Sequence, residues 1–495
     1  DVAPSRGLGD VYKRQMNIRL RNIGVIKDST IKINGLTVIT GQNNSGKTTV
    51  GKVLYSLVDA VDNIKAKSDN DRYEYAIKNI QKTNEMLPTY FMLRNDYEKI
   101  DNQTLRTFFS GTVREKVQKN QINIYLEELI EALEGFNISD EPYNEIISNK
   151  YLRFKHGNSS FIEKFEIYKE DAISTLQRTL EVIESDHELI RYAKDSINNT
   201  LSIEFNNQIQ PAVLQGCTSY IDAESDTEVH FRLEINDNRV IETKNSVYGD
   251  DCPYKKAYFI DNPFILDEPA FRKAHNSEPD YQSFVNNDRF LTHDNKLKFI
   301  LNNSNKKSVF EEGIIDEQYS HVKNMIDAVL PGKFIVNDGE RFYVNGTTNL
   351  NAANLATGSK VFSIMKILLE RGEIDKDTLL VLDEPEAHLH PKWQNAFAEI
   401  IMILVKEVGC NVLLTTHSSN FMLAIDAYMR KYGMDEKCNF YKTEYLEHEP
   451  FVEYKCVNDS LDEIYGDFVQ YLTDVKQLRN CLLYTSPSPR DGATS

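Results

Sequence analysis

The chain has 495 residues, and 75 Asp and Glu against 57 Lys and Arg give it a net charge of −18 at pH 7. This acidity disfavours broad, charge-driven binding to nucleic acid, although it leaves room for a local basic groove. Residues 400–405 form the longest apolar run, which is too short to span a bilayer, and the six cysteines form no C-x-x-C pair. We therefore expect a cytoplasmic protein without membrane contact, its thiols reduced.

Residues 1–15 and 481–495 are expected to be foreign to the protein. One nucleotide stretch can encode the end of the first segment. Its complementary strand, read in a frame shifted by one base, then encodes the start of the second segment. Natural termini have no reason to be reverse complements, so both segments resemble translated sequencing adapters and are excluded from fold prediction. Met16 is then the expected start, and the natural C-terminus is expected beyond Asn480.

Residues 17–40 alternate apolar and polar side chains and predict strands that lead into a Gly-rich motif. The motif fits G-x-x-x-x-G-K-[ST], and an apolar helix follows it. A strand, this loop and a helix in succession are what a phosphate-binding P-loop requires, which disfavours an accidental Gly-rich turn. Lys47 is expected to reach the β- and γ-phosphates of ATP, and Thr48 to bind Mg²⁺. The expected nucleotide contacts are Gly41, Asn43, Asn44, Ser45, Gly46, Lys47, Thr48 and Thr49.

From residue 61 to residue 200 the chain is charged and has helical periodicity. Two apolar stripes predict antiparallel helices that bury them against each other, because a long coiled coil would need more sustained heptads. The stripes are Leu126, Leu129, Ile130 and Leu133, and Ile173, Leu176, Leu180 and Ile183. A basic cluster here favours a solvated helix face over a nucleic-acid contact. It consists of Arg106, Arg114, Lys116 and Lys119.

Strand-like sequence returns after residue 200. Residues 229–235 and 239–243 flank Asn-Asp-Asn and predict a hairpin, and residues 257–266 predict a buried strand followed by a turn. A mixed helical stretch follows. Residues 334–344 then predict a second hairpin around an Asn-Asp-Gly turn.

Three further motifs follow in the last third of the chain. Residues 355–360, Leu-Ala-Thr-Gly-Ser-Lys, precede an apolar helix and place Thr357, Gly358 and Ser359 at an N-terminus that favours anions. An apolar strand then ends in Asp383 and Glu384, at the sheet edge where a P-loop enzyme needs carboxylates. We expect Asp383 to hold Mg²⁺ and Glu384 to orient or deprotonate the attacking water. The next strand ends at His417, which we interpret as a γ-phosphate sensor rather than as a packed histidine.

The order of four motifs resembles that in the ABC-type heads of the RecF, SMC and overcoming-lysogenization-defect ATPases. These motifs are the P-loop, residues 355–360, Leu-Asp-Glu-Pro-Glu-Ala-His-Leu-His-Pro and Thr-Thr-His. This group is usually labelled AAA-family ATPases, and the resemblance covers about 16–58 and 330–456. It implies an α/β fold, an ABC-type P-loop NTPase head with an antiparallel β subdomain and a large, mostly helical insertion. It also implies that Gly358 and Ser359 contact the γ-phosphate of ATP in a partner head, although the motif departs from Leu-Ser-Gly-Gly-Gln.

The resemblance leaves some positions open. Asn262 is a weak candidate for the Q-loop position. The Asp-Glu-Pro-Glu sequence differs from the Asp-Glu-Pro-Thr/Ser of transporter cassettes, which argues against a transporter subunit. His388 and His390 lack a third ligand at metal-site spacing, so we expect them to shape a loop at the dimer interface.

The expected function is ATP hydrolysis with Mg²⁺ by heads that dimerise around ATP. By resemblance, it would serve DNA maintenance or anti-phage defence, with DNA and a nuclease or other effector protein as partners. The alternative is a clamp-like DNA-binding protein in which ATP is a switch with negligible turnover. The expected organisation is tail (1–15), head (16–60), helical insertion (61–200), mixed β/α segment (201–330), head (331–456), terminal helix (457–480) and tail (481–495).

Overall fold

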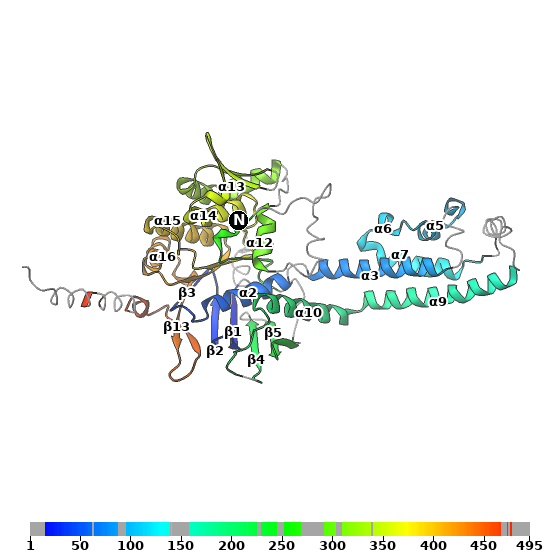
Figure 1. The fold of residues 1–495 in the computed structure, drawn as a ribbon, viewed down its shortest axis with the longest axis horizontal. Coiled ribbons are helices and arrows are strands. Elements are labelled where there is room, and N and C mark those ends of the chain that lie inside the picture. Colours follow the sequence, from blue (N-terminus) through cyan, green and yellow to red (C-terminus); the bar gives the residue numbers. More distant parts are fainter. Residues whose placement is uncertain are drawn as a thin grey trace, which may run out of the picture. The chain divides into compact units, whose positions relative to one another are not determined.

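The computed structural model divides the chain into two compact units, residues 1–62 with 196–495, and residues 63–195 (Figure 1). Both expected foreign tails lie outside the described residues except for Gln15. Of the expected terminal helix, residues 462–466, 473 and 476–477 are helical, whereas residues 457–461 are not. None of the described helices is long and apolar enough to cross a membrane. The described residues are 15–61, 64–87, 96–138, 140, 158–214, 216–224, 229–244, 252–268, 292–302, 309–337, 340–466, 473 and 476–477.

An 11-stranded sheet organises the described part of the larger unit, in the order β6-β5-β4-β1-β2-β14-β13-β3-β12-β11-β7. From β13 to β7 all neighbouring strands are parallel, whereas β6, β5, β4, β1 and β2 pair antiparallel. This arrangement confirms the predicted α/β fold with an antiparallel β subdomain. The strands are β1 (Met16–Ile23), β2 (Ile26–Ile33), β3 (Leu36–Thr40), β4 (Ser219–Glu224), β5 (Val229–Asn236), β6 (Arg239–Lys244), β7 (Lys256–Ile260), β11 (Thr378–Asp383), β12 (Asn411–Thr416), β13 (Cys438–Tyr445) and β14 (Val452–Cys456).

The central parallel strands are buried on both faces because helices cover each side. Every residue of β3 and β12 is buried, which explains their continuous apolar sequences. Leu380 and Leu382 of β11 join a core with the covering helices, whereas Val381 points the other way and meets Gly51 of α2 (Lys47–Val61). Other helices described in this unit include α12 (His293–Asn302), α13 (Val309–Val329), α14 (Thr357–Glu370), α15 (Pro391–Ile403) and α16 (Ser419–Tyr432).

Both predicted hairpins are present. The first is the antiparallel pair β5–β6. The second is β8 (Lys333–Asn337) with β9 (Glu340–Asn345), to which β10 (Thr348–Asn351) adds a third strand. We did not predict β10, whose sequence Thr-Asn-Leu-Asn has the asparagines that usually mark turns.

The smaller unit is helical. The two predicted stripes lie in one core cluster, with Leu126, Leu129 and Leu133 of α7 buried beside Leu176 and Ile183 of α9. Figure 1 shows α3, α7 and α9 lying side by side, and the contacts of α9 with α3 and α7 agree. The helices are α3 (Ile64–Met86), α5 (Gln103–Ser110), α6 (Val113–Lys116), α7 (Ile122–Glu134) and α9 (Asn158–Glu184); α10 (Asp186–Glu204) continues into the larger unit.

Side chains of the basic cluster are used within this unit. Arg114 pairs with Glu74 at 2.6 Å, and the Arg106 guanidinium donates to the Ile100 carbonyl. Lys119 donates to the Asn70 side chain at 2.6 Å. These contacts within the unit favour the interpretation of the cluster as a helix surface over that of a nucleic-acid contact.

Candidate functional site

The predicted P-loop connects β3 to α2, and its glycines are required by its geometry. A Cβ at Gly41 would collide with the Thr443 hydroxyl. Gly46 has φ +77°, and a Cβ there would lie 2.8 Å from a methyl carbon of Val25. Asn44 also adopts a positive φ of 63°, which asparagine tolerates better than most residues. The tight turn that the motif predicts is therefore present.

Lys47 and Thr48 connect this loop to the predicted carboxylates. Only 4% of the Lys47 side chain is exposed, and its ammonium group lies 3.5 Å from Glu384 Oε1. The same ammonium donates to the backbone carbonyls of Gly41 and Gln42 at 3.0 and 2.8 Å. The Thr48 hydroxyl donates to Asp383 Oδ2 at 2.6 Å. The Thr48 and Asp383 oxygens therefore lie close enough together for one cation to contact both.

Thr415 is a site residue that sequence reasoning missed. It lies opposite Asp383 in the β11–β12 pair, and its hydroxyl donates to Asp383 Oδ1. The same hydroxyl accepts the Glu384 backbone N–H at 3.1 Å, at a residue with φ +47°. Thr415 therefore holds both carboxylate residues. Burial raises the pKa of Asp383, against the hydrogen bonds from Thr415 and Thr48 that lower it.

His417 follows β12 and faces the other Glu384 oxygen, with Nδ1 3.3 Å from Oε2 and 46% of its side chain exposed. Glu386 anchors the segment that carries this histidine. One oxygen of the buried Glu386 carboxyl accepts the Thr416 hydroxyl and, at 3.3 Å, the His417 backbone N–H. Sequence reasoning did not assign a role to Glu386, although it lies within the Asp-Glu-Pro-Glu sequence.

The buried carboxyl of Glu386 should make the folding stability of the protein depend on pH. Burial raises its pKa above the ordinary 4.5, although the hydrogen bond from Thr416 opposes this. A carboxyl whose folded-state pKa is raised contributes stability below its unfolded pKa and loses it as pH rises through the folded pKa. The melting temperature of Glu386→Gln, relative to wild type, should therefore be higher at pH 8 than at pH 4.5. Glu444→Gln, at an exposed position of β13, controls for the loss of one charge, and an equal trend in both variants would refute the prediction.

A cavity of about 710 Å³ opens beside the P-loop within the larger unit. Residues 43–49, Asp383 and Glu384 line one part of it. The β1–β2 turn contributes Gly24 and Val25, and the segment after α10 contributes Phe205 and Gln208 among others. No sequence pattern pointed to these last four residues, which are far from the motifs along the chain.

Thr357, Gly358 and Ser359 begin α14, as expected, but they differ in exposure. Thr357 is half-buried, and the preceding Ala356 is exposed. Gly358 and Ser359 are buried, and a Cβ at Gly358 would lie 2.9 Å from the His388 carbonyl oxygen. A partner molecule would therefore meet Ala356 and Thr357 before it met the Ser359 side chain.

The remaining candidates have local structural roles. His390 caps α15 by accepting the Lys392 N–H, and His388 packs its ring edge against Phe264. Among the described residues neither histidine belongs to a group that could hold a metal. The Asn262 side chain caps the short 3-10 helix at residues 263–266, because its Oδ1 accepts the Phe264 N–H at 3.0 Å. Asp261, one residue earlier, instead lines a cavity of about 240 Å³ together with Asp383 and Glu384.

Comparisons with known proteins identify a family for this chain. The model of the AAA ATPase domain family matches residues 16–422. A comparison with curated proteins finds no significant match. Similar solved structures include the SMC head domain from Thermotoga maritima, at 11% identity and a TM-score of 0.34, covering 90% of this chain and 99% of that one. Another is the Smc head domain with an extended coiled coil, derived from Pyrococcus furiosus and bound to the C-terminal domain of ScpA, at 10% identity and a TM-score of 0.30, covering 92% and 98%.

The family match runs from the first strand of the sheet, through the P-loop and both carboxylates, into the helix that follows His417. It spans most of the sequence, so the chain belongs to the AAA ATPase domain family.

Proposed function

We propose that this chain binds Mg·ATP at the P-loop and hydrolyses it to ADP and phosphate. One observation carries the proposal: the side chains that the reaction needs converge at one sheet edge. Lys47 and Thr48 begin α2, Asp383 ends β11 and Glu384 follows it, and His417 follows β12. The Thr48 hydroxyl lies 2.6 Å from Asp383 Oδ2, and the Lys47 ammonium group lies 3.5 Å from Glu384 Oε1. Side chains from these separate elements therefore contact each other.

Each residue has a distinct role in this proposal. Lys47 exchanges its contacts with the Gly41 and Gln42 carbonyls for phosphate oxygens, and Thr48 and Asp383 bind Mg²⁺, which neutralises phosphate charge. Glu384 takes a proton from the attacking water, and Lys47 and Thr415 keep its carboxylate and backbone in place. His417 lies beside Glu384 with its ring half exposed, so it can reach the terminal phosphate.

We further propose that two heads close around ATP, and that the motion acts on DNA or on a nuclease or other effector protein in DNA maintenance or anti-phage defence. The exposure of Ala356 and the half-exposure of Thr357 at the N-terminus of α14 support a contact with a partner's phosphate. The sequence resemblance to RecF, SMC and overcoming-lysogenization-defect heads supports the biological setting.

Steady-state phosphate release tests hydrolysis directly. With ATP and Mg²⁺ the wild type should release phosphate, and double-stranded DNA should change the rate if DNA is a partner. The matched control is Thr48→Ala, which removes a Mg²⁺-binding hydroxyl but keeps the P-loop backbone. If the wild type binds ATP tightly but releases phosphate no faster than Thr48→Ala does, the result would instead favour the clamp-like protein in which ATP is only a switch.

A further inference from the structure

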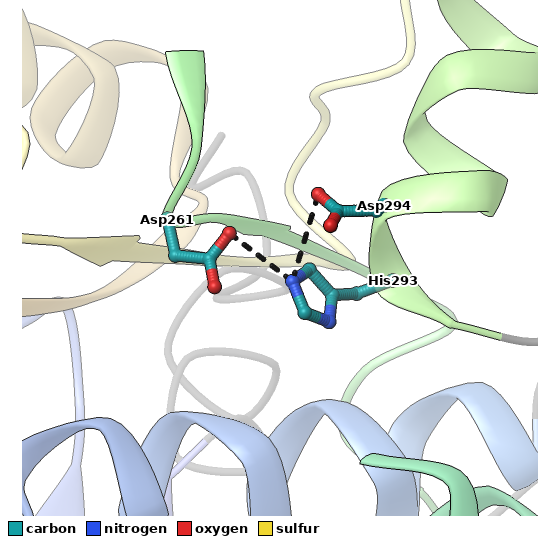
Figure 2. Close-up of side chains that lie close together, drawn as sticks. All are labelled: Asp261, His293 and Asp294. Carbon is teal, nitrogen blue, oxygen red and sulfur yellow. Dashed lines mark hydrogen bonds and ion pairs between the residues drawn. The ribbon is translucent and has the colours of Figure 1, made fainter. Parts of the chain in front are cut away.

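A second cluster of ionisable groups lies outside the P-loop, around His293 (Figure 2). His293 begins α12, Asp294 follows it, and Asp261 follows β7. His293 Nε2 lies 3.1 Å from Asp261 Oδ1 and 3.8 Å from Asp294 Oδ1. The ligand atoms of these three residues all lie within 4.8 Å of one another. Figure 2 shows both carboxylates directed at the same ring nitrogen.

Glu204, at the end of α10, holds the other side of the imidazole. Its Oε2 lies 2.7 Å from His293 Nδ1, and its Oε1 accepts the His293 backbone N–H at 2.8 Å. Only 2% of the Glu204 side chain is exposed. The ring also packs on Phe259, with centroids 4.5 Å apart, and against Tyr55 at 5.9 Å. The imidazole is therefore fixed, and a carboxylate on Nδ1 is the arrangement that directs a histidine Nε2 towards a metal.

We propose that Asp261, His293 and Asp294 bind a divalent transition-metal ion, Zn²⁺ or Mn²⁺, at a site separate from the Mg²⁺ of the nucleotide. Bonds of about 2.1 Å in a tetrahedral site place ligand atoms about 3.4 Å apart, between the two measured distances from Nε2. One imidazole with two carboxylates suits Zn²⁺ or Mn²⁺ better than Mg²⁺ or Ca²⁺, which prefer oxygen alone. The Asp261 and Asp294 side chains are 27% and 45% exposed, so water can complete the coordination.

Charge balance supports a dication here. Glu204, Asp261 and Asp294 surround one imidazole, so even a protonated His293 leaves two negative charges uncompensated. The negative potential of these three carboxylates attracts a divalent cation. Among the described residues no other cation pairs with Asp261 or Asp294.

The site borders the nucleotide site without sharing its ligands. Asp261 lines the cavity of about 240 Å³ that Asp383 and Glu384 also line. A bound ion would connect the end of β7 with the start of α12, and through Glu204 with the end of α10. The Mg²⁺ candidates, Thr48 and Asp383, lie on other elements, so the two sites can be tested independently.

The test is metal titration of the full chain after chelation, without nucleotide. Zn²⁺ and Mn²⁺ are titrated by calorimetry, and Co²⁺ by its visible absorption. We expect one ion per chain, and Asp294→Asn should lower its affinity by at least about 10-fold. Asp294 is the best position to change because nearly half of its side chain is exposed. Glu268→Gln removes a charge that acts on Asp294 without removing a ligand, and Asp383→Asn removes the Mg²⁺ candidate. Both controls should keep the ion.

Two results of the titration would overturn the proposal: no stoichiometric ion in the wild type, or a loss in Glu268→Gln or Asp383→Asn as large as in Asp294→Asn. Pulsed electron paramagnetic resonance of Mn²⁺ on the wild type provides a readout that does not depend on any variant folding. It should detect one coordinated imidazole nitrogen. A spectrum of bound Mn²⁺ without nitrogen coupling would exclude His293 as a ligand.

Discussion

Glu384→Gln should slow ATP hydrolysis by about 10²–10⁴-fold while Mg·ATP still binds. Glutamine keeps the size of the side chain but cannot accept a proton from water. Lys47, Thr48 and Asp383 remain in place, and the backbone N–H of residue 384 can still donate to Thr415. Single-turnover hydrolysis measures the chemical step, and fluorescent ATP analogues measure affinity.

Glu444→Gln on the exposed part of β13 is the matched control and should turn over ATP like the wild type. An unchanged single-turnover rate in Glu384→Gln would remove Glu384 from the role of general base. A parallel loss of affinity and rate would indicate instead that the Lys47–Glu384 ion pair shapes the phosphate site.

The slow variant also tests closure of two heads. If uncleaved ATP holds heads together, the mass of Glu384→Gln by light scattering should rise with ATP and Mg²⁺ but not with ADP. Adding Thr357→Arg should prevent the rise, because this half-buried residue at the start of α14 is accessible to a partner. Ser359 is unsuitable for this purpose, since arginine at a buried position would disturb the head itself. The same mass in every nucleotide state would reject ATP-driven association.

Lys47→Ala should weaken ATP binding by at least about 100-fold. Hydrogen bonds to charged groups contribute about 1.5–3 kcal/mol each, and the ammonium group can donate to more than one phosphate oxygen. A difference of about 1.4 kcal/mol corresponds to tenfold in affinity. Calorimetric titration with Mg·ATP measures the change.

The ammonium group also donates to the carbonyls of Gly41 and Gln42, so the melting temperature of Lys47→Ala should be recorded to confirm that the variant folds. Lys27→Ala is the control for net charge, because Lys27 on β2 is a partly exposed cation that pairs with Glu449. Equal affinities of Lys47→Ala and wild type would contradict the P-loop assignment.

The sequence by itself determined the features that depend on neighbours along the chain. The P-loop motif has glycines where a Cβ would collide with Thr443 or Val25, and continuous apolar runs marked β3, β11 and β12. Alternation around short turns identified both hairpins, because a two-residue period is visible in any single strand. The position of Asp383 and Glu384 at a strand end followed from the same run.

Only the tertiary structure decided which distant side chains meet. Thr415 reaches Asp383 because β12 lies between β3 and β11, and strand order is not encoded in the periodicity of any one strand. Glu204, Asp261 and His293 come from three separate elements, so no spacing in the sequence relates them. The burial of Ser359 likewise appears only in the folded chain, where its neighbour Gly358 packs against the carbonyl of His388. Local patterns specify backbone conformation and which face is apolar, whereas partners across the sheet depend on how the whole chain is threaded.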